Sequence, residues 1–239
     1  MTNTCPYEPV NPVRPRKSSS LTDALDNPAG VIRLSVIDTP IPVLPDAIRS
    51  LADLEVLTLN GNGLVAIPAA LFELQKLRVL NLFNNALTEL PVGLARLTRL
   101  GSLTLGDNPL RQLPDDLALC SSLHELNLAN LPQLDFVQVW PLITQLTGLE
   151  KLSLYQNPIV TLPEAIGQLE QLRVLRLFAC RIKRLPASLT KLSLLEELDL
   201  RANQLDEFSF AEAAFPALRR LDLSYNPMAR VTTVREALI

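Results

Sequence analysis

The stretch Leu77–Arg99 reads LRVLNLFNNALTELPVGLARLTR, and it decides the fold because the rest of the chain repeats it. The same spacing of leucines, one asparagine and one proline returns 23 residues earlier, from Leu54, and 23 residues later, from Leu100. A period of about 20–50 residues is typical of repeat architectures, in which each unit buries its apolar face against its neighbours. The sequence therefore predicts a stack of similar units instead of one globular core.

This template fits the chain nine times, and the fits are called copies one to nine. Every interval between copy starts is 23 residues except the interval from Leu123 to Leu149, which is 26. Apolar residues alternate at template positions one, four and six, which predicts a short strand. A proline followed by two spaced leucines predicts a helical turn, because proline suits the first helical position. The copies start at Val31, Leu54, Leu77, Leu100, Leu123, Leu149, Leu172, Leu195 and Leu218.

Template position nine carries a recurring asparagine. Stacking would place each amide beside the backbone of the adjacent copy, so the sequence predicts a ladder of side-chain hydrogen bonds. Thr39 and Cys180 occupy the same position and can still donate, whereas Leu131 cannot. Because Leu131 lies in the long copy, we expect the ladder to break there and the turn to be rebuilt around Phe136, Val139 and Trp140. The asparagines are Asn62, Asn85, Asn108, Asn157, Asn203 and Asn226.

Composition excludes several classes of partner. The 239 residues include 22 basic and 25 acidic side chains, for a net charge of −3, so no positive field attracts nucleic acid or anionic lipid. No stretch is apolar over the ~18 residues that a membrane span needs, and no secretory signal peptide is evident. We expect neither nucleic acid nor a membrane as a partner.

The chemistry-bearing side chains form no predicted active site. The three cysteines are far apart and show neither metal-ligand spacing nor a disulfide framework, which favours a reducing, cytoplasmic setting. The single histidine, His124, follows Cys120 by four residues, but Cys120 occupies an apolar template position where a thiol serves as packing. The sequence predicts no catalytic, cofactor-binding or metal site, and therefore no enzyme.

Residues 1–19 are rich in proline and serine, which predicts a disordered leader. Within it, Pro12, Pro15 and Lys17 fit the PxxP-plus-basic pattern that some SH3 domains bind; the alternative is a plain solvated tail. Residues 20–30 are predicted to form a capping helix, because Ser20 and Asp23 suit its start. A repeat domain follows over 31–239, with an irregular copy at 123–148 and a terminal copy at 218–239.

The back halves of the copies read LPDAIRSL, IPAALFEL, LPVGLARL, LPDDLALC, LPEAIGQL and LPASLTKL. Together with the strand template, these segments resemble the leucine-rich repeat family in its intracellular 23-residue LPxxLxxL form. They are similar to Ras-group repeat proteins and bacterial type III effectors. The resemblance implies an α/β repeat solenoid of about nine repeats. It would be a curved right-handed horseshoe with a parallel β-sheet on the concave face and short helical or 3-10 turns on the convex face.

Family geometry places template positions three, five, seven and eight on the concave face. These positions are small and polar in the first half of the chain, and aromatic or charged in the second half. Tyrosine and arginine are frequent interface hot spots, so we predict a partner-binding patch. The alternative is a set of scattered residues on a solvated face. The patch comprises Tyr155, Arg176, Phe178, Asp199, Arg201 and Tyr225, joined less directly by Phe83, with Lys151, Glu197 and Arg220 as its polar flank.

Three functional hypotheses follow. The first is a non-enzymatic, monomeric, cytoplasmic module that binds a protein partner on its concave face. The second is the target-recognition domain of a secreted bacterial effector delivered into host cytoplasm, such as a ubiquitin ligase whose catalytic domain lies outside this chain. Two features suggest this second hypothesis. The composition of the leader resembles type III secretion signals, and the sequence ends abruptly at Ile239. The third is a structural array without a dedicated ligand.

Overall fold

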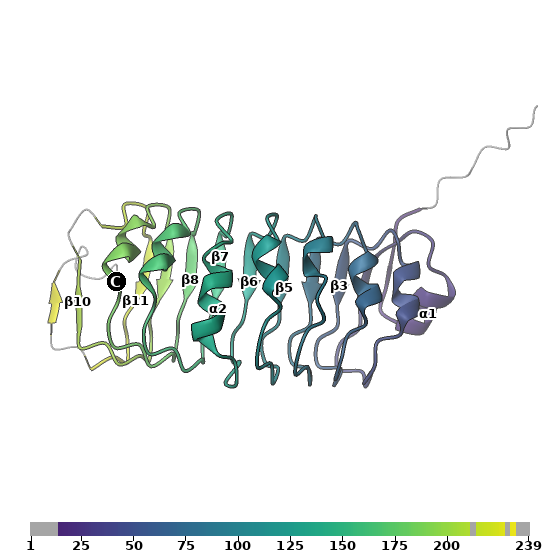
Figure 1. Cartoon of the computed structure of the whole chain (residues 1–239), viewed down its shortest axis with the longest axis horizontal. Coiled ribbons are helices and arrows are strands. Elements are labelled where there is room, and N and C mark those ends of the chain that lie inside the picture. The colour runs from purple at the N-terminus through teal and green to yellow at the C-terminus, as the bar shows by residue number, and fades with distance from the viewer. Residues whose placement is uncertain (1–13, 211–213, 228–229, 233–239) are drawn as a thin grey trace, which may run out of the picture.

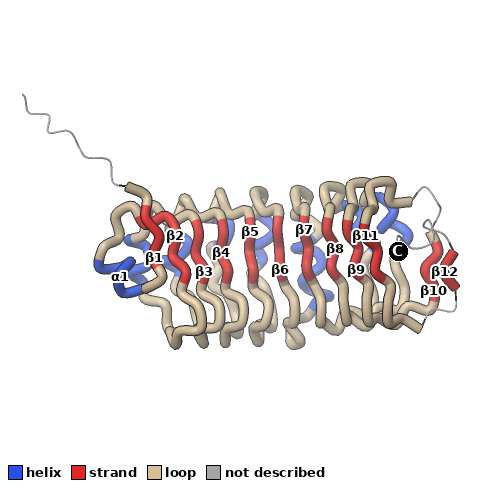
Figure 2. Tube along the Cα trace, turned by 180° about the vertical axis from the view of Figure 1, so that it is seen from behind, coloured by secondary structure: helices blue, strands red, loops and turns tan. Residues whose placement is uncertain are grey.

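The computed structural model of the chain describes residues 14–210, 214–227 and 230–232. The copies stack side by side into an elongated solenoid, with strands on one face and short helices on the opposite face (Figures 1 and 2). We call these the sheet face and the helix face. Ten strands form one open sheet in the order β1 to β9 and then β11. The predicted α/β repeat solenoid is confirmed.

Each copy contributes one short strand to this sheet, and neighbouring strands pair in parallel. Leu57, Leu80 and Leu103 stand side by side in successive strands, so the sheet register equals the 23-residue period. The strands are β1 Arg16–Ser18, β2 Val31–Ser35, β3 Val56–Thr58, β4 Val79–Asn81, β5 Ser102–Thr104, β6 Glu125–Asn127, β7 Lys151–Ser153, β8 Val174–Arg176, β9 Glu197–Asp199, β10 Glu207–Ser209, β11 Arg220–Asp222 and β12 Arg230–Thr232.

The helix face is built mainly from 3-10 helices. A proline precedes most of them as the N-cap, with an extended backbone such as φ −72° and ψ 151° at Pro45. Proline therefore stands one residue before the helix begins, and not at its first position as predicted. These helices are Asp46–Ser50, Ala69–Glu73, Leu94–Arg96, Asp115–Leu119, Glu164–Gln168 and Ala187–Lys191.

The leucines of the template fill the space between the two faces. In the third copy Leu77, Leu82 and Leu87 are fully buried, and their equivalents form one continuous apolar cluster along the solenoid. Each buried leucine stabilises the fold by about 1.5–3 kcal/mol relative to exposure. The shared residues of the template therefore specify stacking.

The predicted asparagine ladder is confirmed. In Asn203, Oδ1 accepts hydrogen bonds from the N–H groups of Cys180 (3.0 Å) and Ile182 (2.9 Å). Its Nδ2 donates to the carbonyls of Leu177 (2.7 Å) and Leu200 (2.9 Å). The bond to the carbonyl of the preceding copy recurs at Asn62, Asn85, Asn108, Asn157 and Asn226.

The ladder breaks at Leu131, as predicted. The N–H groups of Leu64 and Leu87 donate to the asparagine of the next copy, at 3.0 and 3.1 Å. The equivalent N–H of Leu110 faces the copy of Leu131 and makes no hydrogen bond to any described residue. In contrast, the thiol of Cys180 replaces the asparagine as a donor, and its Sγ lies 3.1 Å from the carbonyl oxygen of Leu154.

The long copy carries a true α-helix, α2 (Phe136–Ile143), where copies one to four, six and seven have a 3-10 helix. Asp135 caps it, because its side chain accepts from the N–H of Val137. The residues expected to rebuild the turn are all buried on this helix, Phe136 and Trp140 at 8% exposure and Val139 at 1%. The three additional residues thus provide room for a helix that packs an aromatic pair into the core.

The N-terminal end differs from the sequence prediction. The leader was expected to be disordered up to residue 19, and this is wrong for Arg16–Ser18, which form β1 and pair in parallel with β2. The predicted capping helix is present as α1 (Leu21–Asp26), whose N-cap Ser20 accepts from the N–H of Asp23 at 3.2 Å. Pro12 and the rest of residues 1–13 lie outside the described residues.

At the C-terminal end, the eighth and ninth copies add a second small sheet. Strand β10 pairs in parallel with β12. Phe208 in β10 is buried at the template position that carries the leucine before the proline in most other copies. Parts of the predicted terminal copy, residues 228–229 and 233–239, lie outside the described residues.

Two of the cysteines, Cys120 and Cys180, are free thiols that are buried in the fold. Desolvation raises the pKa of Cys120 and of Cys180 to about 11, chiefly because the buried site disfavours the thiolate. At pH 8 both thiols should therefore resist a thiol reagent such as DTNB in the folded protein and react once urea unfolds it. Rapid labelling of either residue without denaturant, located by peptide mass spectrometry, would contradict this burial.

Candidate functional site

Eight side chains line a concave cavity of about 510 Å³ on the sheet face, and we call them the sheet-face cluster. Five were predicted as the binding patch, and Glu197 and Arg220 were predicted as its flank. Asp222 was not singled out, and Lys151 does not line the cavity. The members are Tyr155, Arg176, Phe178, Glu197, Asp199, Arg201, Arg220 and Asp222.

The parallel register brings these residues together. Arg176, Asp199 and Asp222 occupy template position five in the last three strands of the ten-stranded sheet, and they stand side by side across β8, β9 and β11. Neighbouring strands lie about 4.8 Å apart, which is within the reach of long charged side chains. Side chains two residues apart on one strand share a face, so position seven adds Phe178 and Arg201 to the same surface.

Ion pairs join the cluster across three copies. Arg201 holds Asp199 in a two-point contact, with Nε–Oδ1 at 2.9 Å and Nη2–Oδ2 at 2.7 Å. Arg176 Nε donates to Glu197 Oε1 at 3.0 Å, and Arg220 Nη1 lies 3.8 Å from Glu197 Oε2. Two-point contacts between arginine and a carboxylate restrict both side chains. The predicted arginine hot spots are therefore held by acids of their own chain.

Aromatic contacts complete the cluster. The guanidinium carbon of Arg201 lies 5.1 Å from the centre of the Phe178 ring, within the range of a cation–π contact. The hydrogen bond to Asp199 also raises the pKa of Arg201, so this side chain stays charged. Tyr155 is half-buried at the edge, and its hydroxyl makes no hydrogen bond to a described residue.

Two predicted patch residues lie outside the cavity. Tyr225 sits in the turn after β11 with φ 59° and 86% exposure. Phe83 belongs to the third copy, where its ring packs so closely on Gly106 that a Cβ there would come within 3.2 Å of it. The position of Phe83 is thus explained by packing against the next copy.

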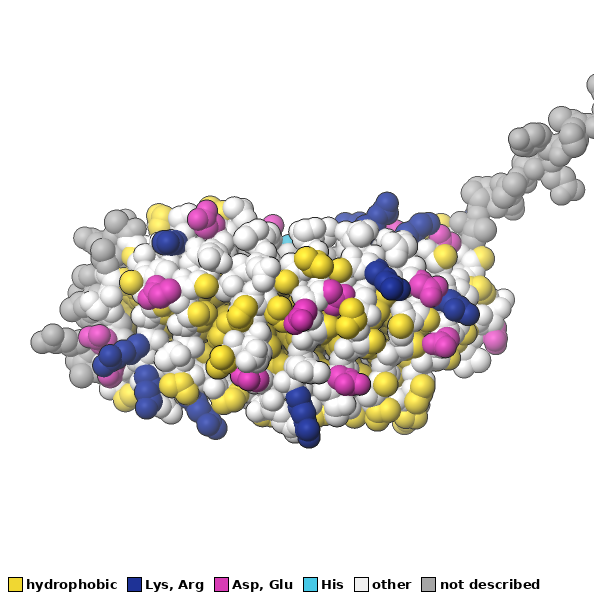
Figure 3. Space-filling view, in the orientation of Figure 1, with side chains coloured by type: hydrophobic (Ala, Val, Ile, Leu, Met, Phe, Trp, Pro, Cys, Tyr) yellow, Lys and Arg dark blue, Asp and Glu magenta, His cyan; other side chains and the backbone are white. Residues whose placement is uncertain are grey.

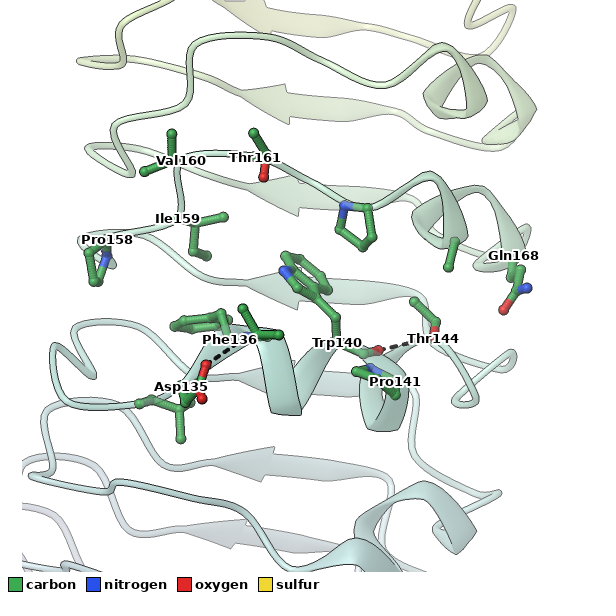
Figure 4. Close-up of a pocket in the computed structure, with 14 residues that line it drawn as sticks. Asp135, Phe136, Trp140, Pro141, Thr144, Pro158, Ile159, Val160, Thr161 and Gln168 are labelled. Carbon is green, nitrogen blue, oxygen red and sulfur yellow. Dashed lines mark hydrogen bonds between the residues drawn. The ribbon is translucent and has the colours of Figure 1, made fainter.

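The structure also contains a groove that the sequence did not predict. A cavity of about 770 Å³ lies on the helix face between α2 and the back of the sixth copy (Figure 4). Phe136 and Trp140 flank it, with ring centres 6.1 Å apart, and Val137 and Val160 at its rim are 77% and 48% exposed. Apolar side chains also gather along the middle of this face (Figure 3).

The chemistry of this groove is limited. Asp135 is the one charged side chain among the lining residues, and its Oδ1 accepts from the N–H of Val137 at 3.0 Å. The hydroxyl of Thr144 donates to the carbonyl of Trp140 at 3.0 Å. The groove therefore offers apolar contact without a paired nucleophile and base. Its only sequence signal was the 26-residue interval.

Elsewhere, the described residues contain no group of three His, Cys, Asp or Glu side chains placed to hold a metal ion. The thiol of Cys120 lies 3.7 Å from the carbonyl oxygen of Asp116. Among the described residues, no hydrogen bond links this thiol to the exposed His124. None of the helices in the described ranges has the length and hydropathy required to cross a bilayer. Lys17, the basic residue of the PxxP pattern, lies in β1.

Comparison with known proteins agrees with this architecture. The leucine-rich repeat family profile matches residues 52–110. A leucine-rich repeat protein of Leptospira interrogans is 26% identical, with a TM-score of 0.76 over 90% of this chain and 71% of that one. The leucine-rich repeat domain of the type III effector XopL is 23% identical, with a TM-score of 0.63 over 87% of this chain and 79% of that one, a likeness of fold alone. No curated protein sequence matches the chain significantly.

Repeat domains of this kind are typically non-catalytic interaction modules. The 23-residue register, the asparagine ladder and the matched profile all lead to one assignment. Residues 52–110 match the leucine-rich repeat profile, and over 90% of its length the chain has the fold of a leucine-rich repeat protein.

Proposed function

We propose that the chain is a non-enzymatic interaction module that binds a protein partner on its sheet face, centred on the sheet-face cluster. The observation that carries this proposal is the cavity of about 510 Å³, where arginines and half-buried aromatic rings converge from neighbouring copies. Arginine and tyrosine are enriched among residues that dominate binding energy at protein interfaces. The fold supports the proposal, because solenoids commonly bind along an extended concave surface.

The cluster is also pre-organised. Arg201 is held by Asp199 and lies over Phe178, and Arg176 is held by Glu197, so these side chains have already lost much of their rotational freedom. Binding a partner therefore costs less side-chain entropy than it would on a flexible surface. The ion pairs within the cluster therefore hold its side chains in place before the partner binds.

Replacing Tyr155 and Phe178 together by alanine tests this proposal. We expect the double variant to lose partners that the wild-type chain captures from lysate, with binding weakened at least about tenfold, because both aromatic side chains that line the cavity are truncated. Capture followed by quantitative mass spectrometry measures the effect, and thermal unfolding checks that the solenoid remains folded.

The matched control is the pair Val137→Ala and Val160→Ala, which changes two exposed side chains beside the helix-face groove. This control should retain every partner. If the control loses the partner while Tyr155→Ala with Phe178→Ala keeps it, the binding surface is the helix face and the proposal is wrong.

A further inference from the structure

Each carboxylate of the sheet-face cluster already lies beside a guanidinium group. Glu197 faces Arg176 with one oxygen and Arg220 with the other, at 3.0 and 3.8 Å. Both oxygens of Asp199 accept from Arg201, at 2.9 and 2.7 Å. A carboxylate that already contacts guanidinium groups gains less from a new cationic partner than a free one would.

The third acid, Asp222, is held by Ser224 and also lies beside Arg201. Its Oδ1 accepts from the N–H and the hydroxyl of Ser224, at 3.1 and 2.7 Å. Its Oδ2 lies 3.6 Å from Nε of Arg201. Every carboxylate oxygen of the cluster therefore has a donor or a cation beside it.

The guanidinium groups retain spare donors. Each guanidinium carries five N–H bonds. Among the described residues, Arg176 donates only through Nε and Arg201 donates through Nε and Nη2, while Arg220 makes one contact at 3.8 Å, beyond hydrogen-bond length. The three side chains are 42%, 44% and 76% exposed, so their free N–H groups can reach a ligand. The unused hydrogen-bonding capacity of the cavity is thus mostly donor capacity.

The excess of free donors over free acceptors favours a ligand that accepts hydrogen bonds. Three arginines face three acids, so the cluster has no net charge and offers little long-range attraction to a polyanion such as nucleic acid. At short range, planar N–H pairs match the two oxygens of a carboxylate. The aromatic surfaces of Tyr155 and Phe178 add apolar contact area beside these donors.

Resting on the proposed function, we propose that the partner presents an acidic segment, whose aspartate or glutamate carboxylates accept hydrogen bonds from Arg176, Arg201 and Arg220. The intrachain acids hold the arginines in place and leave their outer N–H groups for the partner. Glu197 has a second effect, because its charge opposes an incoming carboxylate.

The test uses end-blocked hexaglutamate as the probe, with hexaglutamine and hexalysine for comparison. In the full ¹⁵N-labelled chain, hexaglutamate should shift the Nε–H signals of Arg176, Arg201 and Arg220 and leave that of Arg33, an exposed arginine on β2, unchanged. Hexaglutamine and hexalysine should shift none of them. Equal shifts at Arg33, no shift with hexaglutamate, or preferential binding of hexalysine would overturn the proposal.

The variant Glu197→Gln tests whether removing an acid of the cluster strengthens the binding of hexaglutamate. It should strengthen hexaglutamate binding several-fold, because it removes a repelling charge and frees donors, whereas Arg176→Gln with Glu197→Gln should be at least about tenfold weaker than Glu197→Gln. Glu125→Gln is the control, since Glu125 occupies the same template position in β6 and contacts Ser102 instead of an arginine. Weaker binding by Glu197→Gln would overturn the proposal, as would displacement of hexaglutamate by a thymidine hexanucleotide at equal concentration.

The two proposals fail differently. If Tyr155→Ala with Phe178→Ala loses its partner while hexaglutamate does not bind, the sheet face remains the binding surface and the acidic ligand is wrong. If hexaglutamate binds while that double variant keeps its partner, the partner occupies another surface and the proposed function is wrong.

Discussion

Replacing Trp140 by alanine is expected to lower the free energy of unfolding by about 3–5 kcal/mol, the usual cost of truncating a large buried aromatic side chain. Trp140 is 8% exposed, packs against Phe136 and belongs to α2, which interrupts the regular back of the solenoid. Because a repeat contacts only its neighbours, the fifth and sixth copies should unfold first and the transition should broaden. Urea unfolding followed by far-ultraviolet circular dichroism measures this, since the variant lacks the only tryptophan of the chain.

Val137→Ala is the matched control on the same helix. Val137 is 77% exposed, so its truncation should change the stability by less than about 0.5 kcal/mol. If Trp140→Ala unfolds at the same urea concentration as Val137→Ala, the aromatic pair does not hold α2 against the core.

Asn203→Leu is expected to lower the free energy of unfolding by about 1–3 kcal/mol, because it leaves buried backbone groups unpaired. Asn203 is 5% exposed and is bonded both to its own copy and to the preceding one. Leucine has a similar volume but supplies neither donor nor acceptor, so the change isolates the hydrogen bonds. The shift of the urea midpoint at constant slope measures the loss.

The chain itself supplies a graded comparison. Cys180 fills the asparagine position with a donor alone, so Asn203→Cys should cost less than Asn203→Leu if donation to the carbonyl of the preceding copy carries part of the effect. Gln204→Leu changes the exposed neighbour and should be nearly neutral. Equal midpoints for Asn203→Leu and Gln204→Leu would show that the ladder contributes nothing to stability.

The candidate site was only partly predictable. Template positions five and seven placed Arg176, Phe178, Asp199 and Arg201 on one face, because side chains in a strand alternate and parallel copies repeat in register. The sequence could not show that Arg201 pairs with Asp199 and covers Phe178, because such contacts depend on side-chain rotamers.

Other residues show the same limit. Tyr225 shares the repeat template, but it falls in a turn with positive φ and does not line the cavity. The hydrophilic segment Arg16–Ser18 carries no apolar alternation, yet it joins the sheet through backbone bonds such as Arg16 N–H to the Gly30 carbonyl at 2.8 Å. The edge strand of a sheet presents unpaired backbone N–H and C=O groups, which can pair with a strand of almost any composition. No pattern of side chains therefore predicts the pairing of β1 with β2.

The sequence by itself determined the unit, its register and its ladder. A leucine or asparagine repeated every 23 residues can be buried and hydrogen-bonded in every copy only if the copies stack in parallel. Only the tertiary structure decided which charges remain available on the sheet face and where the helix face opens into a groove. Both depend on distances between side chains of different copies, which follow from packing and not from the period.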